Sequence, residues 1–224
     1  MSGVVTTCCV VLVVLAVRRE LTGRSHGVAN PRQTAARLLP SFDSLINAGT
    51  LLGSSDRGKR LVVFSDFECQ ACRRFSETLH DVAIRFEGRL AIYIVHYPLQ
   101  QHRFAYRAAQ ASECAADQGR FQAFHDLLYS LQDSIGILSW SVMAQRAEVP
   151  DSARFHVCTS QRSALRVDAA GALVQRHGID RTPSIVMEGW LLPRTPGSAQ
   201  LEEFLLAFEQ GRVPNALREI SQKD

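Results

Sequence analysis

The sequence predicts an α/β fold: a mixed sheet flanked by helices, with an all-helical insertion between the second and third core strands. Three observations lead to it. An apolar run that begins at Leu61 passes through a Cys-x-x-Cys into a stretch with the 3.6-residue apolar period of a helix. A second run of strand formers, Leu90 to Val95, follows, and a helical crossover of this kind pairs two strands in parallel. The third strand, Thr182 to Gly189, comes only after a long series of helical patterns.

The elements between those strands have their own boundary signals. Gly88 ends the first helix, Gly119 ends an alanine-rich helix, and Pro150 stops a later one. The predicted helices are 99–118, 120–131, 140–147 and 153–158 within an insertion of about residues 99–163, then 164–177 and 201–208. After the third strand, Leu191 and Leu192 are predicted to form an edge strand, which ends the sheet in an antiparallel hairpin.

Composition and charge bound the class of protein. Of the 224 residues, 46% are hydrophobic and 21% charged, as in an ordinary globular protein. The formal net charge of +3, from scattered basic residues, argues against a nucleic-acid partner. The apolar stretch Val4 to Val17 is shorter than the ~20 residues of a spanning helix and indicates a signal-peptide core or a short membrane anchor. The predicted organisation is an anchor or signal segment (1–17), a polar tether (18–49), the domain itself (50–212) and a tail (213–224). The end of the tether, with residues up to 52, could add a short helix or strand to the edge of the domain.

Cys69 and Cys72 are placed where the first strand gives way to its helix. A helix N-terminus has unpaired N–H groups and a partial positive charge, so it stabilises a thiolate and lowers its pKa below the ~8.5 of a free cysteine. Two alternatives are weaker. A zinc site needs a second ligand pair, which the sequence lacks, and a structural disulfide between these residues would close almost no loop. The pattern therefore predicts a disulfide that is made and broken.

Several separated segments carry a family resemblance. They are Val-Val-Phe-Ser-Asp-Phe-Glu-Cys69-Gln-Ala-Cys72, His-Tyr-Pro98-Leu99, Glu113-Cys114-Ala, Gln118-Gly119-Arg-Phe121, His125-Asp126 and Gly178-Ile-Asp-Arg-Thr182-Pro183-Ser. Over about residues 50–210 the chain resembles the DsbA-like thiol–disulfide oxidoreductases, which have a thioredoxin fold with a helical insertion. A Cys-x-x-Cys after a strand is moderately specific, and the Thr-Pro strand far downstream makes the combination strong.

The resemblance implies roles for the site residues. Cys69 would be the exposed, reacting thiol and Cys72 the buried resolving thiol. Pro183 would follow a cis peptide bond and pack across the active site, and the backbone of Thr182 would pair with an extended substrate. A further pair, Cys114 and Cys158, lies on two helices of the insertion. In an exported protein this pair is predicted to form a structural disulfide, and the alternative is two independent buried thiols.

The residues around the thiols depart from the family pattern. Members often have a proline after the first cysteine and an aromatic residue or histidine before the second, where this chain has Gln70 and Ala71. One donor to the Cys69 thiolate is therefore missing. Asp66 and Glu68 are candidate proton shuttles, and the alternative is that they are solvated turn residues.

The predicted function is a thiol–disulfide oxidoreductase that exchanges disulfides with cysteine-containing exported proteins, acting as an oxidant. The cysteine pair carries the electrons, so no cofactor is expected. No metal site is expected either, because His102, His125 and His177 lack ligand spacing and are interpreted as surface or helix-end residues. The resemblance implies a protein of the cell envelope, periplasmic or otherwise extracytoplasmic. It would be secreted or held at the membrane by its N-terminal segment. It would be recycled by a membrane redox partner such as a vitamin K epoxide reductase-like protein. A thioredoxin-like reductase or isomerase, and a non-enzymatic peptide-binding chaperone, remain alternatives.

Overall fold

The computed structural model describes residues 35–53 and 55–221. The predicted anchor or signal segment and the first part of the tether lie outside these residues. Among the residues that are described, no helix is long and apolar enough to cross a membrane.

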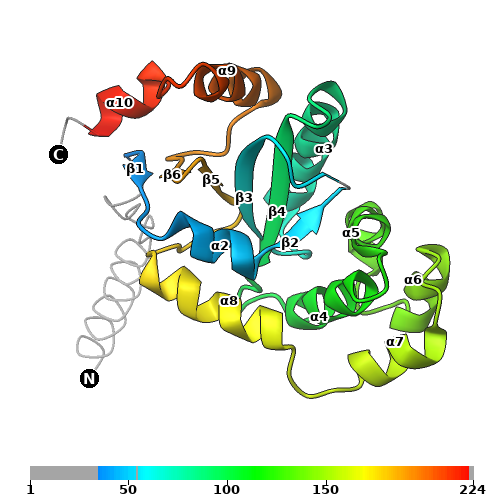
Figure 1. Ribbon diagram of the computed structural model, residues 1–224. Coiled ribbons are helices and arrows are strands. Elements are labelled where there is room, and N and C mark those ends of the chain that lie inside the picture. Colours follow the sequence, from blue (N-terminus) through cyan, green and yellow to red (C-terminus); the bar gives the residue numbers. More distant parts are fainter. Residues whose placement is uncertain (1–34, 54, 222–224) are drawn as a thin grey trace, which may run out of the picture. The chain divides into compact units, whose positions relative to one another are not determined.

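In the described part of the chain, six strands form one sheet, and helices cover it (Figure 1). The strands are β1 (Arg37–Leu38), β2 (Thr50–Leu52), β3 (Lys59–Ser65), β4 (Leu90–His96), β5 (Ser184–Met187) and β6 (Trp190–Leu191). The helices are α2 (Phe42–Ala48), α3 (Gln70–Arg85), α4 (Ala105–Ala116), α5 (Phe121–Ser130), α6 (Trp140–Arg146), α7 (Ser152–Thr159), α8 (Leu165–Arg176), α9 (Ser198–Glu209) and α10 (Asn215–Ser221), with a 3₁₀ turn, η2 (Gln132–Ser134), between α5 and α6.

The sheet is mixed, and its order is β1-β6-β5-β3-β4-β2. β3 and β4 pair in parallel across the α3 crossover, as predicted, and β5 pairs antiparallel with β3. β5 and β6 form a hairpin whose two turn residues, Glu188 and Gly189, both have positive φ (48° and 85°). Positive φ at both central positions matches the twist of the flanking strands, and glycine adopts it without steric cost.

Side chains alternate between the two faces of β3 because successive strand residues point in opposite directions. Leu61 and Val63 belong to an apolar cluster with α3 and α9, whereas Val62 and Phe64 belong to a second cluster with α2 and α8. Figure 1 accordingly shows α3 and α8 on opposite sides of the sheet. The structure is thus a sheet between two helical layers, the fold class that the sequence predicts.

Helices α4 to α7 form the insertion and carry a third apolar cluster. The segment after β3 joins this cluster through Phe67, Cys69 and Cys72, and α5 contributes Phe124 and Leu128. The cysteine pair therefore lies at the junction between the sheet and the insertion.

The folded unit begins earlier and ends later than predicted. It starts at Ala35, and Leu45 of α2 is fully buried, so residues 35–49 belong to the domain and not to a tether. β1 pairs with β6, which makes β1 the edge of the sheet in place of Leu191–Leu192. In the predicted tail, α10 places Leu217 in the same cluster as α9. These short elements are too brief to show a periodic pattern in the sequence.

Candidate active site

Cys69 is the N-cap residue of α3. Its backbone is extended (φ −79°, ψ 117°), and its sulfur accepts a hydrogen bond from the backbone N–H of Cys72 at 3.4 Å. Both cysteines are free thiols in the structure. The residue exposures, 9% for Cys69 and 2% for Cys72, have the predicted order. Cys69 is nevertheless mostly covered, because the insertion packs over the start of α3.

The surroundings move the two thiol pKa values in opposite directions. The hydrogen bond with the Cys72 side chain is the largest influence on Cys69. Together with Thr182 and the backbone N–H groups of Cys72 and Ala71 it outweighs burial and lowers the pKa of Cys69 to about 5. Burial, followed by the interaction with Cys69, raises the pKa of Cys72. At neutral pH the reduced pair therefore holds a thiolate on Cys69 and a proton on Cys72.

The Thr182-Pro183 segment lies directly beside Cys69. The peptide bond between these residues is cis, and the Cys69 thiol donates to the Thr182 carbonyl oxygen at 3.4 Å. Pro183 is buried and Thr182 half-buried. The turn before β5 thus brings residues far apart in the sequence against the reactive sulfur.

Asp66 and Glu68 do not behave as solvated turn residues. The carboxylate of Asp66 is buried and accepts hydrogen bonds from the N–H groups of Glu68 and Leu99, at 2.8 and 2.7 Å, and lies 2.8 Å from Nδ1 of His102. Glu68 accepts from the N–H of Phe104 at 2.5 Å. Both carboxylates hold the loop after β4 against the segment before the cysteines, and a role in proton transfer stays a prediction.

Two polar groups next to the cysteines come from the insertion and have no sequence signal. The amide of Gln132 donates through Nε2 to the carbonyl oxygens of Phe67 and Cys69, at 2.7 and 3.1 Å. The hydroxyl groups of Tyr129 and Ser65 lie 2.5 Å apart. A residue more than sixty positions away cannot be paired with the cysteine segment by local spacing. Sequence reasoning therefore missed both.

The histidines are more buried than expected. His125 in α5 is 1% exposed and His177 4%, and burial is the main influence that lowers the pKa of each. The interpretation as surface or helix-end residues is wrong for His125, which is buried within α5. His177 is also buried, but it stands at the C-terminal end of α8, as one of the two alternatives predicts. Within residues 35–53 and 55–221, no group of three or more histidine, cysteine or acidic residues could hold a metal ion.

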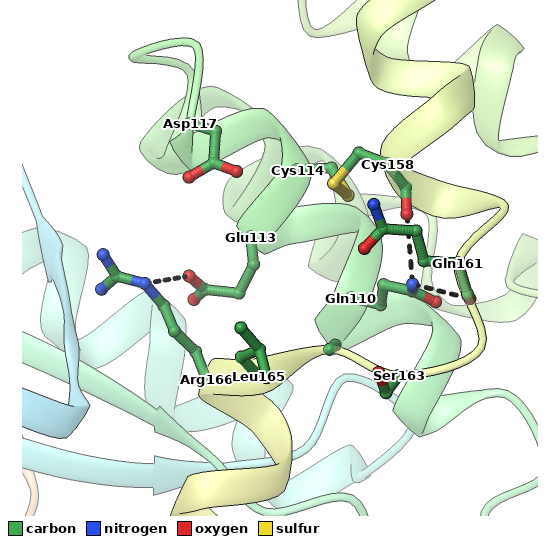
Figure 2. A pocket seen from close by; sticks show the side chains of 10 residues that line it. Gln110, Glu113, Cys114, Asp117, Cys158, Gln161, Ser163, Leu165 and Arg166 are labelled. Carbon is green, nitrogen blue, oxygen red and sulfur yellow. Dashed lines mark hydrogen bonds and ion pairs between the residues drawn. A yellow bond between two sulfur atoms is a disulfide. The ribbon is translucent and has the colours of Figure 1, made fainter.

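Cys114 of α4 and Cys158 of α7 form a disulfide, with their Cα atoms 5.8 Å apart. Figure 2 shows the bond at the wall of a cavity of about 300 Å³ between α4 and the segment that leads into α8. The amide of Gln110 donates to the carbonyl oxygens of Cys158 and Gln161 and holds the same segment. The disulfide therefore ties two helices of the insertion together, on elements that do not carry Cys69 or Cys72.

Removing this disulfide should lower the free energy of unfolding by about 4 kcal/mol, because a link across 44 residues restricts the unfolded chain. The double variant Cys114→Ser/Cys158→Ser, denatured with urea beside the wild type, measures the difference. A Cys69–Cys72 disulfide would close only a one-turn loop, so Cys69→Ser/Cys72→Ser is the matched comparison and should change the free energy of unfolding by less. A change below about 1 kcal/mol in the double variant would contradict the prediction.

Paired thiols at a helix start, beside a cis-proline and on a mixed sheet with a helical insertion, define a thioredoxin-fold protein with a dithiol site. Residues 47–206 match the thioredoxin family. The chain belongs to that family, and its likeness to the DsbA-like proteins is confirmed at the level of the fold.

Two solved structures illustrate the shared fold. A thioredoxin-like oxidoreductase from Silicibacter pomeroyi DSS-3 superposes with a TM-score of 0.64 at 22% identity, over 78% of this chain and 100% of that one. The thiol-disulfide exchange protein alpha-DsbA2 from Wolbachia pipientis gives a TM-score of 0.62 at 15% identity, over 74% of this chain and 90% of that one.

The curated relatives include proteins that are named as ion antiporters. The Na(+)/H(+) antiporter NhaA 1 of Mycolicibacterium gilvum is 30% identical over an aligned stretch of 169 residues, and the match covers 71% of this chain and 26% of the antiporter. The chain thus spans about a quarter of the length of the curated relatives that it matches.

Proposed function

We propose that the protein is a thiol–disulfide oxidoreductase that oxidises cysteine pairs in exported proteins. The observation that carries this proposal is the asymmetric pair, in which Cys69 has a pKa of about 5 and the pKa of buried Cys72 is raised. A stabilised thiolate stabilises the reduced form, and a protein whose reduced form is stable is a good oxidant.

In the proposed reaction the oxidised protein, with a Cys69–Cys72 disulfide, meets a substrate that has two thiols. A substrate thiolate attacks the sulfur of Cys69, forming a mixed disulfide, and the bond to Cys72 breaks with its electron pair on Cys72. Burial raises the pKa of Cys72, so this sulfur takes up a proton. The second substrate thiolate then attacks the first substrate sulfur and expels Cys69 as a thiolate. The substrate loses two electrons to the protein.

Thr182 supports the binding of an extended substrate at this point. Its carbonyl oxygen lies 3.4 Å from the reactive sulfur, at the start of β5. A polypeptide aligned with this backbone would place its cysteine next to Cys69. The proposal thus assigns Cys69 and Cys72 to the chemistry, and Thr182 and Pro183 to substrate binding.

The proposal includes an extracytoplasmic location. The Cys114–Cys158 disulfide is of a kind that persists in oxidising compartments, and one of the solved proteins of this fold is described as periplasmic. A net oxidant must be reoxidised after each turnover. We therefore include in the proposal a membrane redox partner, such as a vitamin K epoxide reductase-like protein, with anchoring by the N-terminal segment.

The match to the antiporters gives no reason to propose ion transport for this chain, because it covers 26% of the antiporter. The match covers 71% of this chain, and the thioredoxin domain takes up residues 47–206, so most of the matched part is that domain. We take the shared part to be a thioredoxin-like domain that those relatives also carry.

Equilibration with glutathione buffers tests the proposed direction of electron flow. The pKa of Cys69 lies between the ~7 of thioredoxin and the ~3.5 of DsbA, so the potential should lie between about −270 and about −120 mV. A midpoint at or below the thioredoxin value would favour the reductase alternative. A cysteine pair that does not exchange with glutathione at all would favour the peptide-binding alternative.

A further inference from the structure

Gln132 is the first residue of η2 and is buried, at 5% exposure. Its side-chain amide reaches across to the segment that leads into α3. Nε2 donates to the carbonyl oxygen of Phe67 at 2.7 Å and to that of Cys69 at 3.1 Å. One side chain of the insertion therefore satisfies two carbonyl groups on the backbone around the reactive cysteine.

The Cys69 carbonyl has two donors. The second is the backbone N–H of Arg73, at 3.1 Å, in the first turn of α3. The neighbour of Gln132, Asp133, also contacts this turn through an ion pair with Arg73 at 3.6 Å, but its side chain is 83% exposed. η2 therefore contacts the start of α3 twice, once through a buried amide and once through a solvated carboxylate.

The orientation of the Gln132 amide follows from its surroundings. Turned the other way, Oε1 would face two carbonyl oxygens, which cannot donate hydrogen bonds. As placed, Oε1 is buried and has no hydrogen-bond partner among the residues that the structure describes. A buried acceptor left unpaired is costly, so the arrangement is maintained by the two bonds that Nε2 makes.

These contacts bear on the charge that Cys69 carries. A carbonyl oxygen has a partial negative charge. The Phe67 and Cys69 carbonyls belong to the backbone that carries the Cys69 thiolate, and the Thr182 carbonyl oxygen lies 3.4 Å from its sulfur. The N–H groups of Gln132 compensate that negative potential. Without them, the Phe67 carbonyl would lose this donor and the Cys69 carbonyl would keep only the Arg73 N–H. The less compensated carbonyl dipoles would disfavour a negative charge in a poorly solvated site.

We propose that Gln132 is a positioning residue through which the helical insertion fixes the backbone of Cys69 and favours its thiolate. This inference rests on the proposed function for its meaning in catalysis, but its direct readout is a property of the reduced protein alone. The insertion thereby contributes to the reactivity of a site whose cysteines belong to the sheet domain.

Two variants of nearly the same shape test it. Gln132→Met removes the donors and leaves the site neutral. In Gln132→Glu, burial and the facing carbonyl oxygens keep the new carboxyl protonated at pH 5, so that it retains one donor in place of two. The rate of Cys69 alkylation by iodoacetamide at pH 5 should fall about 3-fold in Gln132→Met and by a smaller factor in Gln132→Glu, which keeps one donor, since each pKa unit changes the thiolate fraction about tenfold below the pKa. Thiolate absorbance against pH reads the same shift without any reagent.

Asp133→Asn is the matched control, because it changes the adjacent exposed contact and should not slow alkylation. If Gln132→Glu does not fold, Gln132→Met decides the question. Gln132 variants that fold and retain the wild-type thiolate titration would overturn the inference. A wild-type protein that titrates as described but oxidises no substrate would instead overturn the proposed function, so the two failures are distinguishable.

Discussion

Replacing Cys69 with serine should abolish disulfide exchange, with a loss of at least about 10³-fold relative to the wild type. Cys69 is the thiol whose pKa is lowered to about 5 and the one that lies beside the Thr182 carbonyl oxygen. A serine hydroxyl forms no disulfide with substrate. Cys72 is more deeply buried than Cys69 and its pKa is raised, so it lacks the thiolate needed to replace Cys69. Oxidation of a reduced two-cysteine peptide, followed by mass change, measures the rate.

The double variant Cys114→Ser/Cys158→Ser is the control for this prediction. It also removes cysteines, but from the insertion, and should retain exchange at a temperature where it stays folded. The assignment would be reversed if Cys69→Ser retained substantial exchange while Cys114→Ser/Cys158→Ser lost it. The reactive disulfide would then lie in the insertion.

Selective alkylation of the reduced protein should depend on pH in a way set by Cys69. Only the thiolate reacts. Because the pKa is about 5, the rate should rise about tenfold per pH unit below that value and level off above it. The pKa of Cys72 is raised, so Cys72 should stay unlabelled near pH 6, where Cys69 reacts at nearly its full rate. Peptide mapping after brief iodoacetamide treatment at several pH values resolves the two sites.

The same pKa gives a sign for stability. A folded-state pKa below the ordinary thiol value contributes stability that is present above about pH 8.5 and is lost as pH falls through about 5. The reduced form should therefore lose stability relative to the oxidised form between these limits as the solution is acidified.

In the alkylation experiment, preferential labelling of Cys72, or a Cys69 profile that levels off only above pH 8, would contradict the assignment of the thiolate.

The sequence predicts the central part of the fold because that part has long, regular patterns. The run from Leu61 shows a buried strand, and α3 shows a 16-residue amphipathic helix. The ends of the domain are different. β1 has two residues and α2 and α10 seven each, so their apolar residues are too few to show a period. Their place is set by pairing and burial against distant segments, such as Arg37 with Leu191.

The site divides in a similar way. Cys69, Cys72 and Pro183 are found because their residue types are rare in this arrangement and their local spacing is informative. Gln132 and Tyr129 are ordinary residues on ordinary helical segments, and only the packing of the insertion brings them to the cysteines. Asp66 is identified from the sequence as a candidate proton shuttle. The sequence does not show its hydrogen-bond partners Leu99 and His102, because only the fold places them beside it.

Mass spectrometry of a trapped mixed disulfide tests most directly whether Cys69 is the sulfur that meets the substrate. In Cys72→Ser, the Cys69 thiolate should attack the disulfide of an oxidised single-cysteine peptide, release one peptide thiolate and remain bonded to the other, because no resolving thiol is left. The expected result is one peptide adduct per protein, on the fragment that contains Cys69. An adduct on Cys114 or Cys158, or no adduct in a folded protein, would contradict the assignment.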